Sequence, residues 1–451
     1  MPARVAQSRR PNTTRPCCVS GLFFSNRFYK LMTFDRKFLL SAIAAALVPV
    51  LESHAETAEA LAQRALHDNP ELRFYVAGIA AAKGAVRTAG TIRNPELNTT
   101  AGYKNTHDNF GGLSGDGGTF AFSFSQTFEY PGRIALRKAI ANHDVDLAEL
   151  HLEQFRLTLA ARVRTLAYGV ASTHTKALAI REIAGRFQAL SDVLAQRPVA
   201  GVTPQLEAQL ISGNVLTFQR QEREAALAEK TLAAELNQLC GRSTNVPLIV
   251  NAGAVLFRPA SLPNLLKTAR TRAFDVRIRQ VELAQQGFKV ALSKNERYPA
   301  IAVGPFYSLE NAADQEQQVG LGISFPLPLW DRKAGDIATS QAREQQVRAS
   351  LLAAQREVDR RVTQNAATLE AKRAEIEKWK ADAVAKFRDA AELADRNYRL
   401  GSVPLPIYVE TQKQYLEVIN ALNDAQKDAL EAAQELEILT GLKLYKEGPR
   451  P

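Results

Sequence analysis

The sequence predicts a mainly α-helical protein with a membrane β-barrel portion, built from two copies of one unit. Three observations predict this fold: landmarks that recur about 200 residues apart, four short segments that alternate at period two, and two helical segments of over sixty residues. The chain has 451 residues, 46% of them hydrophobic and 23% charged. This composition supports a sizeable core and excludes both a disordered chain and a polytopic helical membrane protein.

Charge is concentrated at the N-terminus. The chain carries a net charge of +10, but residues 1–55 alone hold eight Lys/Arg against two acidic residues. The remainder has 49 basic against 45 acidic residues, which is close to balance. A nucleic-acid partner is therefore not indicated.

The segment 32–55 has the pattern of a secretory signal peptide. Charged residues after Met32 are followed by an apolar run at 38–51 and by small residues at Ser53 and Ala55. The apolar run is too short to span a bilayer as a permanent helix. The alternative interpretation is a buried N-terminal helix. We interpret residues 1–31 as sequence upstream of the true start codon. The mature chain would then keep one cysteine, Cys240, and no internal disulfide.

The landmarks of the duplication keep one order. Gly201 recurs as Gly401 and Gly241 as Gly441; Tyr130-Pro131-Gly132-Arg133 pairs with Leu329-Trp330-Asp331-Arg332, and Asn94-Pro95 with Tyr298-Pro299. We therefore predict a first repeat at 56–250, a second at 251–442 and a disordered tail at 443–451. Each repeat is expected to contain a helix, two strands, a long helix, a turn and a return helix.

The predicted strands are 96–106 and 119–129 in the first repeat and 299–309 and 318–327 in the second, separated by loops at 106–118 and 310–317. Phe120, Phe122, Phe124 and Phe128 alternate with small or hydroxyl residues. A strand of about ten residues crosses a hydrocarbon core when tilted. The alternative is a soluble sandwich, but the rest of the chain offers no second sheet.

Four strands cannot close a membrane barrel, for which about eight is the usual minimum. An open edge in lipid leaves backbone groups unsatisfied. The strands must therefore be pooled between subunits.

The long helices, predicted at 134–196 and 334–397, carry a coiled-coil seam. The first would be roughly 95 Å long at the α-helical rise. Its seam runs through Leu159, Val163, Leu166, Val170, Thr173, Ala177, Ile180, Ala184, Phe187, Ser191 and Leu194. The second runs through Val358, Val362, Leu369, Ile376, Trp379, Ala383, Ala390 and Leu393. An ordinary two-stranded coiled coil without a pore would show the same pattern.

Catalytic and metal-binding patterns are not found in the sequence. The five mature histidines are scattered without metal-ligand spacing, and Gly115-Asp116-Gly117-Gly118 precedes no lysine-bearing helix. We predict that the protein is not an enzyme and binds no cofactor or metal.

The duplicated order resembles the TolC family of outer membrane factors. The resemblance covers about 56–442 and is carried by residues 124–133 with Leu136-Arg137, by residues 325–332, and by Tyr398-Arg399-Leu400-Gly401 with the Glu410-Thr411-Gln412 and Tyr415-Leu416 pieces. It implies a homotrimer in the cell outer membrane, with one 12-stranded barrel above a long periplasmic α-helical coiled-coil tunnel. The sequence departs from the family at Arg197-Pro198-Val199, and Pro404 and Pro406 stiffen the second turn.

The resemblance also implies a function. It is that of a channel subunit of a tripartite efflux system, passively conducting substrate from a periplasmic adaptor protein and an inner-membrane pump of the resistance-nodulation-division type. The residues 129–133 and 328–332 look most like the branch paired with heavy-metal or cation pumps. The alternatives are a type I protein-secretion duct and, in a different class, a periplasmic coiled-coil scaffold without a pore.

Site residues follow from the same resemblance. The turns at Gly201, Val202, Gly401 and Ser402 would form the periplasmic tip and contact the adaptor, although glycine there is also what a helical hairpin turn needs. Glu207 and Glu410 lie just beyond these turns, where threefold symmetry would make acidic rings that attract cations. A solvated helix face is the alternative for both glutamates.

Overall fold

The computed structural model describes residues 56–107, 109–196, 202–251, 255–258, 261–312, 314–379 and 382–447. The predicted signal peptide at 32–55, the upstream segment 1–31 and Gly201 lie outside these residues. Among the helices of this part of the chain, none has the length and apolar character needed to cross a bilayer.

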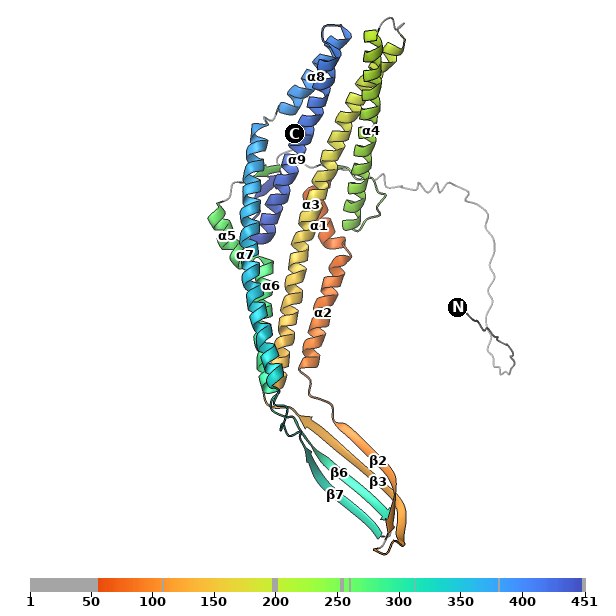
Figure 1. Ribbon diagram of the computed structural model, residues 1–451, viewed down its shortest axis with the longest axis vertical. Coiled ribbons are helices and arrows are strands. Elements are labelled where there is room, and N and C mark those ends of the chain that lie inside the picture. The colour runs from red at the N-terminus through yellow and green to blue at the C-terminus, as the bar shows by residue number, and fades with distance from the viewer. Residues whose placement is uncertain are drawn as a thin grey trace, which may run out of the picture. The chain divides into compact units, whose positions relative to one another are not determined.

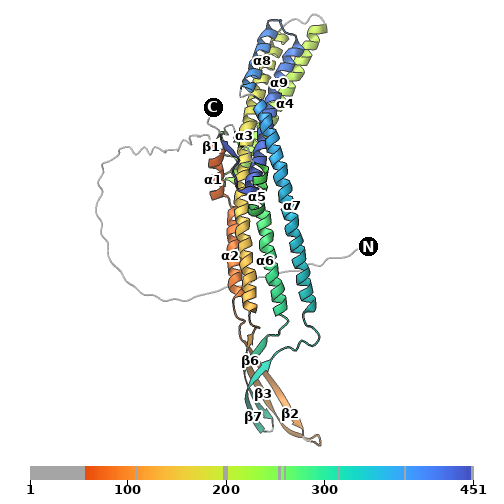
Figure 2. The same ribbon diagram turned by 90° about the vertical axis from the view of Figure 1, so that its left-hand side faces the viewer.

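Helices make up most of the described chain, as Figure 1 shows. They are α1 (Ala58–Asp68), α2 (Glu71–Ala89), α3 (Arg133–Ala195), α4 (Val202–Leu239), α5 (Leu262–Arg272), α6 (Phe274–Asn295), α7 (Ala334–Lys378), α8 (Ala383–Arg399) and α9 (Leu405–Thr440). The strands are β1 (Glu56–Thr57), β2 (Glu96–His107), β3 (Leu113–Phe128), β4 (Val250–Asn251), β5 (Val255–Phe257), β6 (Ile301–Ala312), β7 (Asp314–Ser324) and β8 (Tyr445–Glu447). The four long strands lie at one end of the helices, and the α8–α9 turn lies at the other (Figures 1 and 2).

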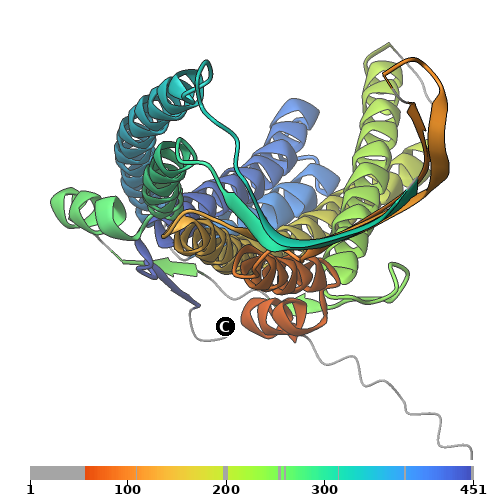
Figure 3. The same ribbon diagram turned by 90° about the horizontal axis from the view of Figure 1, so that it is seen from below.

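The long strands form one antiparallel sheet in the order β2-β3-β6-β7. Each repeat therefore contributes one hairpin, and the β3–β6 pairing joins the two repeats. The sheet curves when it is seen along the helices (Figure 3). Short strands pair near the middle of the helices: β1 with β4 in parallel, and β5 with β8 antiparallel.

Both hairpins are longer than the sequence indicated. The strand predicted at 119–129 begins at Leu113, and the one predicted at 318–327 begins at Asp314 and ends at Ser324. The segments predicted as loops at 106–118 and 310–317 are therefore mostly strand. Backbone pairing continues through Gly115, Gly117 and Gly118 because the ladder needs no side chains.

The predicted disordered tail at 443–451 is wrong over its first part. Leu444 and Tyr445 are buried, and β8 pairs with β5. The apolar side chains dock against the helices, so this short segment is ordered. Residues 448–451 lie outside the described part of the chain.

The duplication is visible in the pattern of burial. Positions related by the offsets of the sequence landmarks, 199, 200 and 204, are buried in both copies. The pairs are Leu159 and Val358, Val163 and Val362, Val170 and Leu369, Leu236 and Leu436, Leu239 and Leu439, Leu61 and Leu265, and Ala65 and Ala269. The predicted fold class, a mainly helical chain with a strand portion and a duplicated unit, is confirmed.

The first long helix is continuous, and its seam packs as predicted: Val163, Ile180 and Phe187 are fully or almost fully buried. The second is not continuous. It is interrupted between α7 and α8, where Trp379 takes an extended conformation with φ −73° and ψ 96°. Beyond the interruption Ala391 and Ala394 are buried instead of the predicted Ala390 and Leu393, because the break advances the helix phase by about one residue.

Candidate channel surfaces: the sheet and the helical tip

The two faces of the four-stranded sheet differ in chemistry. The strand register places the apolar side chains of all four strands on one face, and they are exposed: Leu97, Phe120, Phe122, Phe124, Phe128, Ile301, Val319, Leu321 and Ile323. Val319 is 81% exposed and Leu321 75%. An exposed apolar patch of this extent marks contact with lipid or with another protein.

The opposite face is polar. It carries small, hydroxyl, amide and charged residues: Thr100, Lys104, Ser123, Ser125, Ser308, Glu310 and Gln318. Lys104 Nζ lies 2.5 Å from Glu310 Oε2, and the pair spans β3 between its two neighbouring strands. A face with paired charges and hydroxyls suits water, as in the interior of a membrane barrel.

Two glycines allow close packing inside the sheet. A methyl group on Gly304 would overlap the carbonyl oxygen of Phe124 on β3. On Gly320 it would lie 2.6 Å from the ring of Phe306, the one large aromatic side chain among the described residues of the polar face. Phe306 therefore covers the gap that Gly320 leaves.

Where the sheet meets the helices, Arg133 at the start of α3 joins the two repeats. Its guanidinium donates to Asn295 Oδ1 at 2.9 Å, to the Asn295 carbonyl at 3.0 Å and to the Tyr298 carbonyl at 2.7 Å. The rings of Tyr130 and Tyr298 stack at 4.3 Å. Glu129 accepts from Arg137 at 2.7 Å. We define these contacts as the intrachain joint.

The helical turn at Gly401 is well defined. Gly401 has φ 74°, and the Ser402 amide donates to the Asn397 carbonyl at 2.9 Å, which closes the end of α8. A Cβ on Gly401 would meet no atom within 4 Å, so the turn presents open backbone. Gly401 is thus a helical hairpin turn. The corresponding Gly201 lies outside the described residues, and Val202 begins α4. Their predicted contact with an adaptor remains a prediction.

The two predicted gate residues lie on different hairpins. Glu207 is half-buried on α4, and Glu410 is exposed on α9, where its Oε1 accepts from Gln414 Nε2 at 3.2 Å. Neither forms an ion pair with another residue of the described chain. The acidic-ring hypothesis for both residues remains untested.

A charged network that the sequence did not reveal joins the two hairpins below the tip. Arg186 on α3 contacts Glu182 at 2.7 Å and Glu392 on α8 at 3.5 Å, and Arg388 on α8 contacts the same two carboxylates at 3.4 Å each. The buried Gln412 accepts from Arg186 and donates to the Ala391 carbonyl at 2.7 Å. The contributing residues are far apart in sequence: Glu182 on α3 and Arg388 on α8 are separated by 206 positions.

Metal-ligating side chains do not gather in the described chain. No group of three or more His, Cys, Asp or Glu residues there could hold a metal ion. Burial raises the pKa of the Cys240 thiol to about 11, and its Sγ lies 3.6 Å from the Leu61 carbonyl. This cysteine packs between helices as a small apolar residue.

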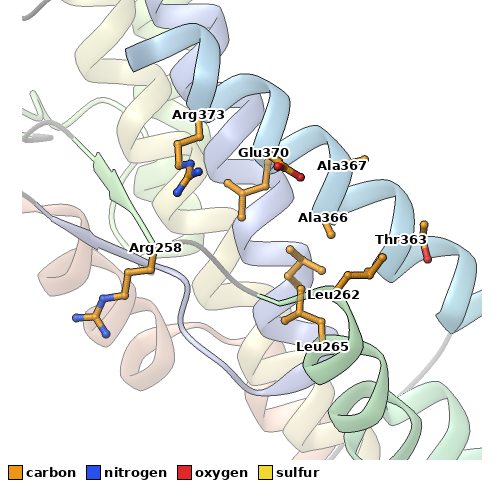
Figure 4. Close-up of a pocket in the computed structure, with 10 residues that line it drawn as sticks. Arg258, Leu262, Leu265, Thr363, Ala366, Ala367, Glu370 and Arg373 are labelled. Carbon is orange, nitrogen blue, oxygen red and sulfur yellow. The ribbon is translucent and has the colours of Figure 1, made fainter. Parts of the chain in front are cut away.

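A cavity of about 250 Å³ lies between α5, α7 and α9. Figure 4 shows Leu262 and Leu265 facing it from α5, and Thr363, Ala366 and Ala367 lying along α7. Arg258, Glu370 and Arg373 rim it. Small side chains on α7 leave this space open.

The geometry described above, a curved sheet with one apolar and one polar face at the end of long helices, agrees with a family match. The model of the outer membrane efflux protein family matches residues 61–242 and 265–442, one segment in each repeat. The chain belongs to the outer membrane efflux protein family. The predicted resemblance to TolC-type channels and the predicted outer-membrane location are confirmed, and the protein is an outer-membrane efflux channel.

Solved structures show the same fold for this efflux protein. The Campylobacter jejuni CmeC outer membrane channel is 14% identical with a TM-score of 0.68, and 85% of each chain is covered. The Vibrio cholerae outer membrane protein VceC is 16% identical with a TM-score of 0.64, covering 85% of this chain and 96% of that one. The open state of the Neisseria gonorrhoeae MtrE channel is 15% identical with a TM-score of 0.65, covering 86% and 89%. No curated protein matches the efflux protein in sequence.

Proposed function

We propose that this efflux-family protein is the outer-membrane subunit of a tripartite efflux system and works as a homotrimer. One observation carries the proposal: the sheet has an apolar face, a polar face and two edge strands, β2 and β7, each of which pairs with a described strand on one side only. In lipid each unsatisfied backbone group costs several kcal/mol, on the order of 2–7. Three copies pairing β7 with β2 give a closed barrel of twelve strands.

The barrel would place the apolar face toward lipid and the polar face toward a water-filled duct. Its twelve strands exceed the usual minimum of about eight for a membrane barrel and leave an interior channel. The helices would continue this duct into the periplasm. Substrate would pass through passively, delivered by an adaptor protein and an inner-membrane pump of the resistance-nodulation-division type.

Pore formation is tested by reconstitution of the purified full chain into planar bilayers. We expect stepwise ion conductance from trimeric material. Absence of conductance from trimers would contradict a duct and favour the periplasmic scaffold. Affinity purification from membranes then separates the two duct types, since a secretion duct would copurify with a protein-exporting ATPase pump.

The tip proposal assigns adaptor contact to Gly201, Val202, Gly401 and Ser402. The support is the open backbone at Gly401. Gly401→Trp should abolish efflux in living cells while the trimer persists in the outer membrane. Gly111→Trp is the matched control, because Gly111 is also exposed, has a similar positive φ of 83°, and leaves a Cβ no atom to meet within 4 Å. Normal efflux by the Gly401 variant would overturn the assignment.

The gate proposal assigns Glu207 and Glu410 to acidic rings. Threefold symmetry would place three copies of each carboxylate around one axis, which favours cations. Replacing both by glutamine should lower the cation-to-anion permeability ratio of the reconstituted channel. An unchanged ratio would show that both side chains belong to a solvated helix face.

A further inference from the structure

We infer that the residues around Trp330 and Arg332 dock on residues 91–94 of a second copy of this chain, reproducing between chains the joint that Arg133 makes within one. The inference deepens the proposed homotrimer and rests on it. The surface around Trp330 and Arg332 is what each copy would offer to the next, and the internal duplication is the reason to expect it.

The intrachain joint defines what one repeat presents to the next. The first repeat supplies Tyr130 from the segment between β3 and α3 and Arg133 from the first position of α3. The second supplies Asn295 from the end of α6 and Tyr298 from just beyond it. Around this joint β3 pairs with β6, and α3 packs along α6. Arg133 is buried and its guanidinium has three acceptors, so this side chain holds the sheet and the helices in one orientation.

The duplication supplies an unused copy of each half of this joint. At the offset of the landmarks, 199, Tyr130 corresponds to Leu329 and Arg133 to Arg332. At the offset of 204, Tyr298 corresponds to Asn94, and Asn295 to Thr91. The same offsets relate the buried positions of the two repeats, so the correspondence holds in the folded chain as well as in the sequence.

Both unused halves are exposed. Trp330 is 93% exposed and Leu329 61%, and Arg332 has no hydrogen bond or ion pair among the described residues. On the other side Ile92 is 66% exposed, and Thr91 and Asn94 are exposed too. One half adjoins the β7 edge and the other the β2 edge, the two edges that a second copy would pair. Arg332 would donate to the backbone carbonyls of Thr91 and Asn94, as Arg133 donates to those of Asn295 and Tyr298.

A second place on the molecule repeats this relation. Arg164 on α3 contacts Glu437 near the end of α9 at 3.7 Å, and Tyr445, in the segment after α9, covers it with its ring centre 5.9 Å from the guanidinium. The equivalent position on α7 is Thr363, which lines the open cavity of Figure 4. The duplication places the segment after α4 of a second copy over it. Asn245, the counterpart of Tyr445, is exposed in that segment, and so is Val246.

Cysteine crosslinking tests the inference in the full chain. Asn94→Cys and Leu329→Cys are combined in a background with Cys17→Ser, Cys18→Ser and Cys240→Ala, and membranes are treated with a short bismaleimide. Tyr130→Cys with Tyr298→Cys is the matched control, because these rings stack within one chain. Leu329→Cys alone is the second control. Native mass in detergent is recorded for every variant.

We expect covalent dimers and trimers from the Asn94/Leu329 pair, monomers from the Tyr130/Tyr298 pair, and monomers from the single variant. Arg332→Ala added to the first pair should reduce the crosslinked fraction at least severalfold, whereas Arg156→Ala, at an exposed arginine of α3, should not. Trimers that give no crosslink between chains would overturn the inference and leave the proposed function standing. Absence of trimers in the uncrosslinked protein would overturn both.

Discussion

Arg164 shows how single residues hold the middle of the molecule together. It lies on α3 and binds Glu59 of α1 through two hydrogen bonds, of 3.0 and 3.2 Å, while Lys443 approaches the same carboxylate at 3.3 Å. Burial raises the pKa of Glu59, but the hydrogen bonds and charge of Arg164, together with the charge of Lys443, outweigh it and hold the pKa below its ordinary value. Glu59 is therefore more stable as a carboxylate in the folded chain than in the unfolded one.

This direction fixes the sign of a pH effect. A carboxyl group with a lowered folded pKa stabilises above its unfolded pKa, about 4.3 for glutamate, and that contribution disappears as the pH falls through the folded value. Glu59→Gln should lower the melting temperature at pH 7, and its difference from wild type should shrink below about pH 4. Glu71→Gln is the control, at an exposed glutamate that forms no ion pair with another described residue. A difference independent of pH would contradict this account.

At the scale of single elements, the sheet depends on close backbone approach. Gly304→Ala places a methyl group against the Phe124 carbonyl and 2.8 Å from Ser125 Cα, so β6 must move away from β3. We expect a loss of about 1–3 kcal/mol, the usual cost of overpacking. Gly287→Ala in α6 meets no atom within 4 Å and should be neutral or stabilise by up to about 1 kcal/mol. Denaturation of the folded protein in detergent measures both; equal stabilities would contradict the observed packing.

The two faces of β7 allow a second test at this scale. Leu321→Arg puts a charge on the apolar face, at a cost of about 2–4 kcal/mol if the residue lies near the bilayer midplane. Gln318→Arg puts the same side chain on the polar face and should cost little. Folding into lipid vesicles, followed by the urea midpoint, compares the two variants. A larger loss for the Gln318 variant would show that the faces are assigned the wrong way round.

The structure could be predicted from the sequence where apolar residues recur at the period of a strand or a helix. The alternation of Phe120, Phe122 and Phe124 gave the sheet face, and the seam through Val163 and Phe187 gave the α3 packing. Prediction failed at the interruption before α8, because no Pro or Gly occurs at residues 379–382 to mark the end of a helix. The hairpin lengths were missed because glycine and polar residues pair in a ladder without a hydrophobic signal.

The candidate sites divide in the same way. Gly401 was predictable because a glycine between two helical patterns is a local signal. The Arg133 joint was not, since its partners lie about 160 residues away in the other repeat and nothing local connects them. The network of Arg186 and Arg388 was missed for the same reason. Long-range pairs of polar residues become visible only in the folded chain.

For the whole molecule, the open edges and the unused halves of the joint lead to one conclusion. A single chain has a sheet with one apolar and one polar face, and its edge strands β2 and β7 are each paired on one side only. Three copies related by rotation would close this sheet into a ring that leaves no edge. The family match supports the channel, and the internal duplication supports the way in which copies meet.

The mass of the assembly tests the central claim most directly. Native mass spectrometry of the full-length protein, extracted from outer membranes in mild detergent, should show a species of three chains, with the monomer appearing only after denaturation. A monomeric mass from membranes that carry active efflux, or a chain released by osmotic shock without detergent, would contradict the account of a shared membrane barrel.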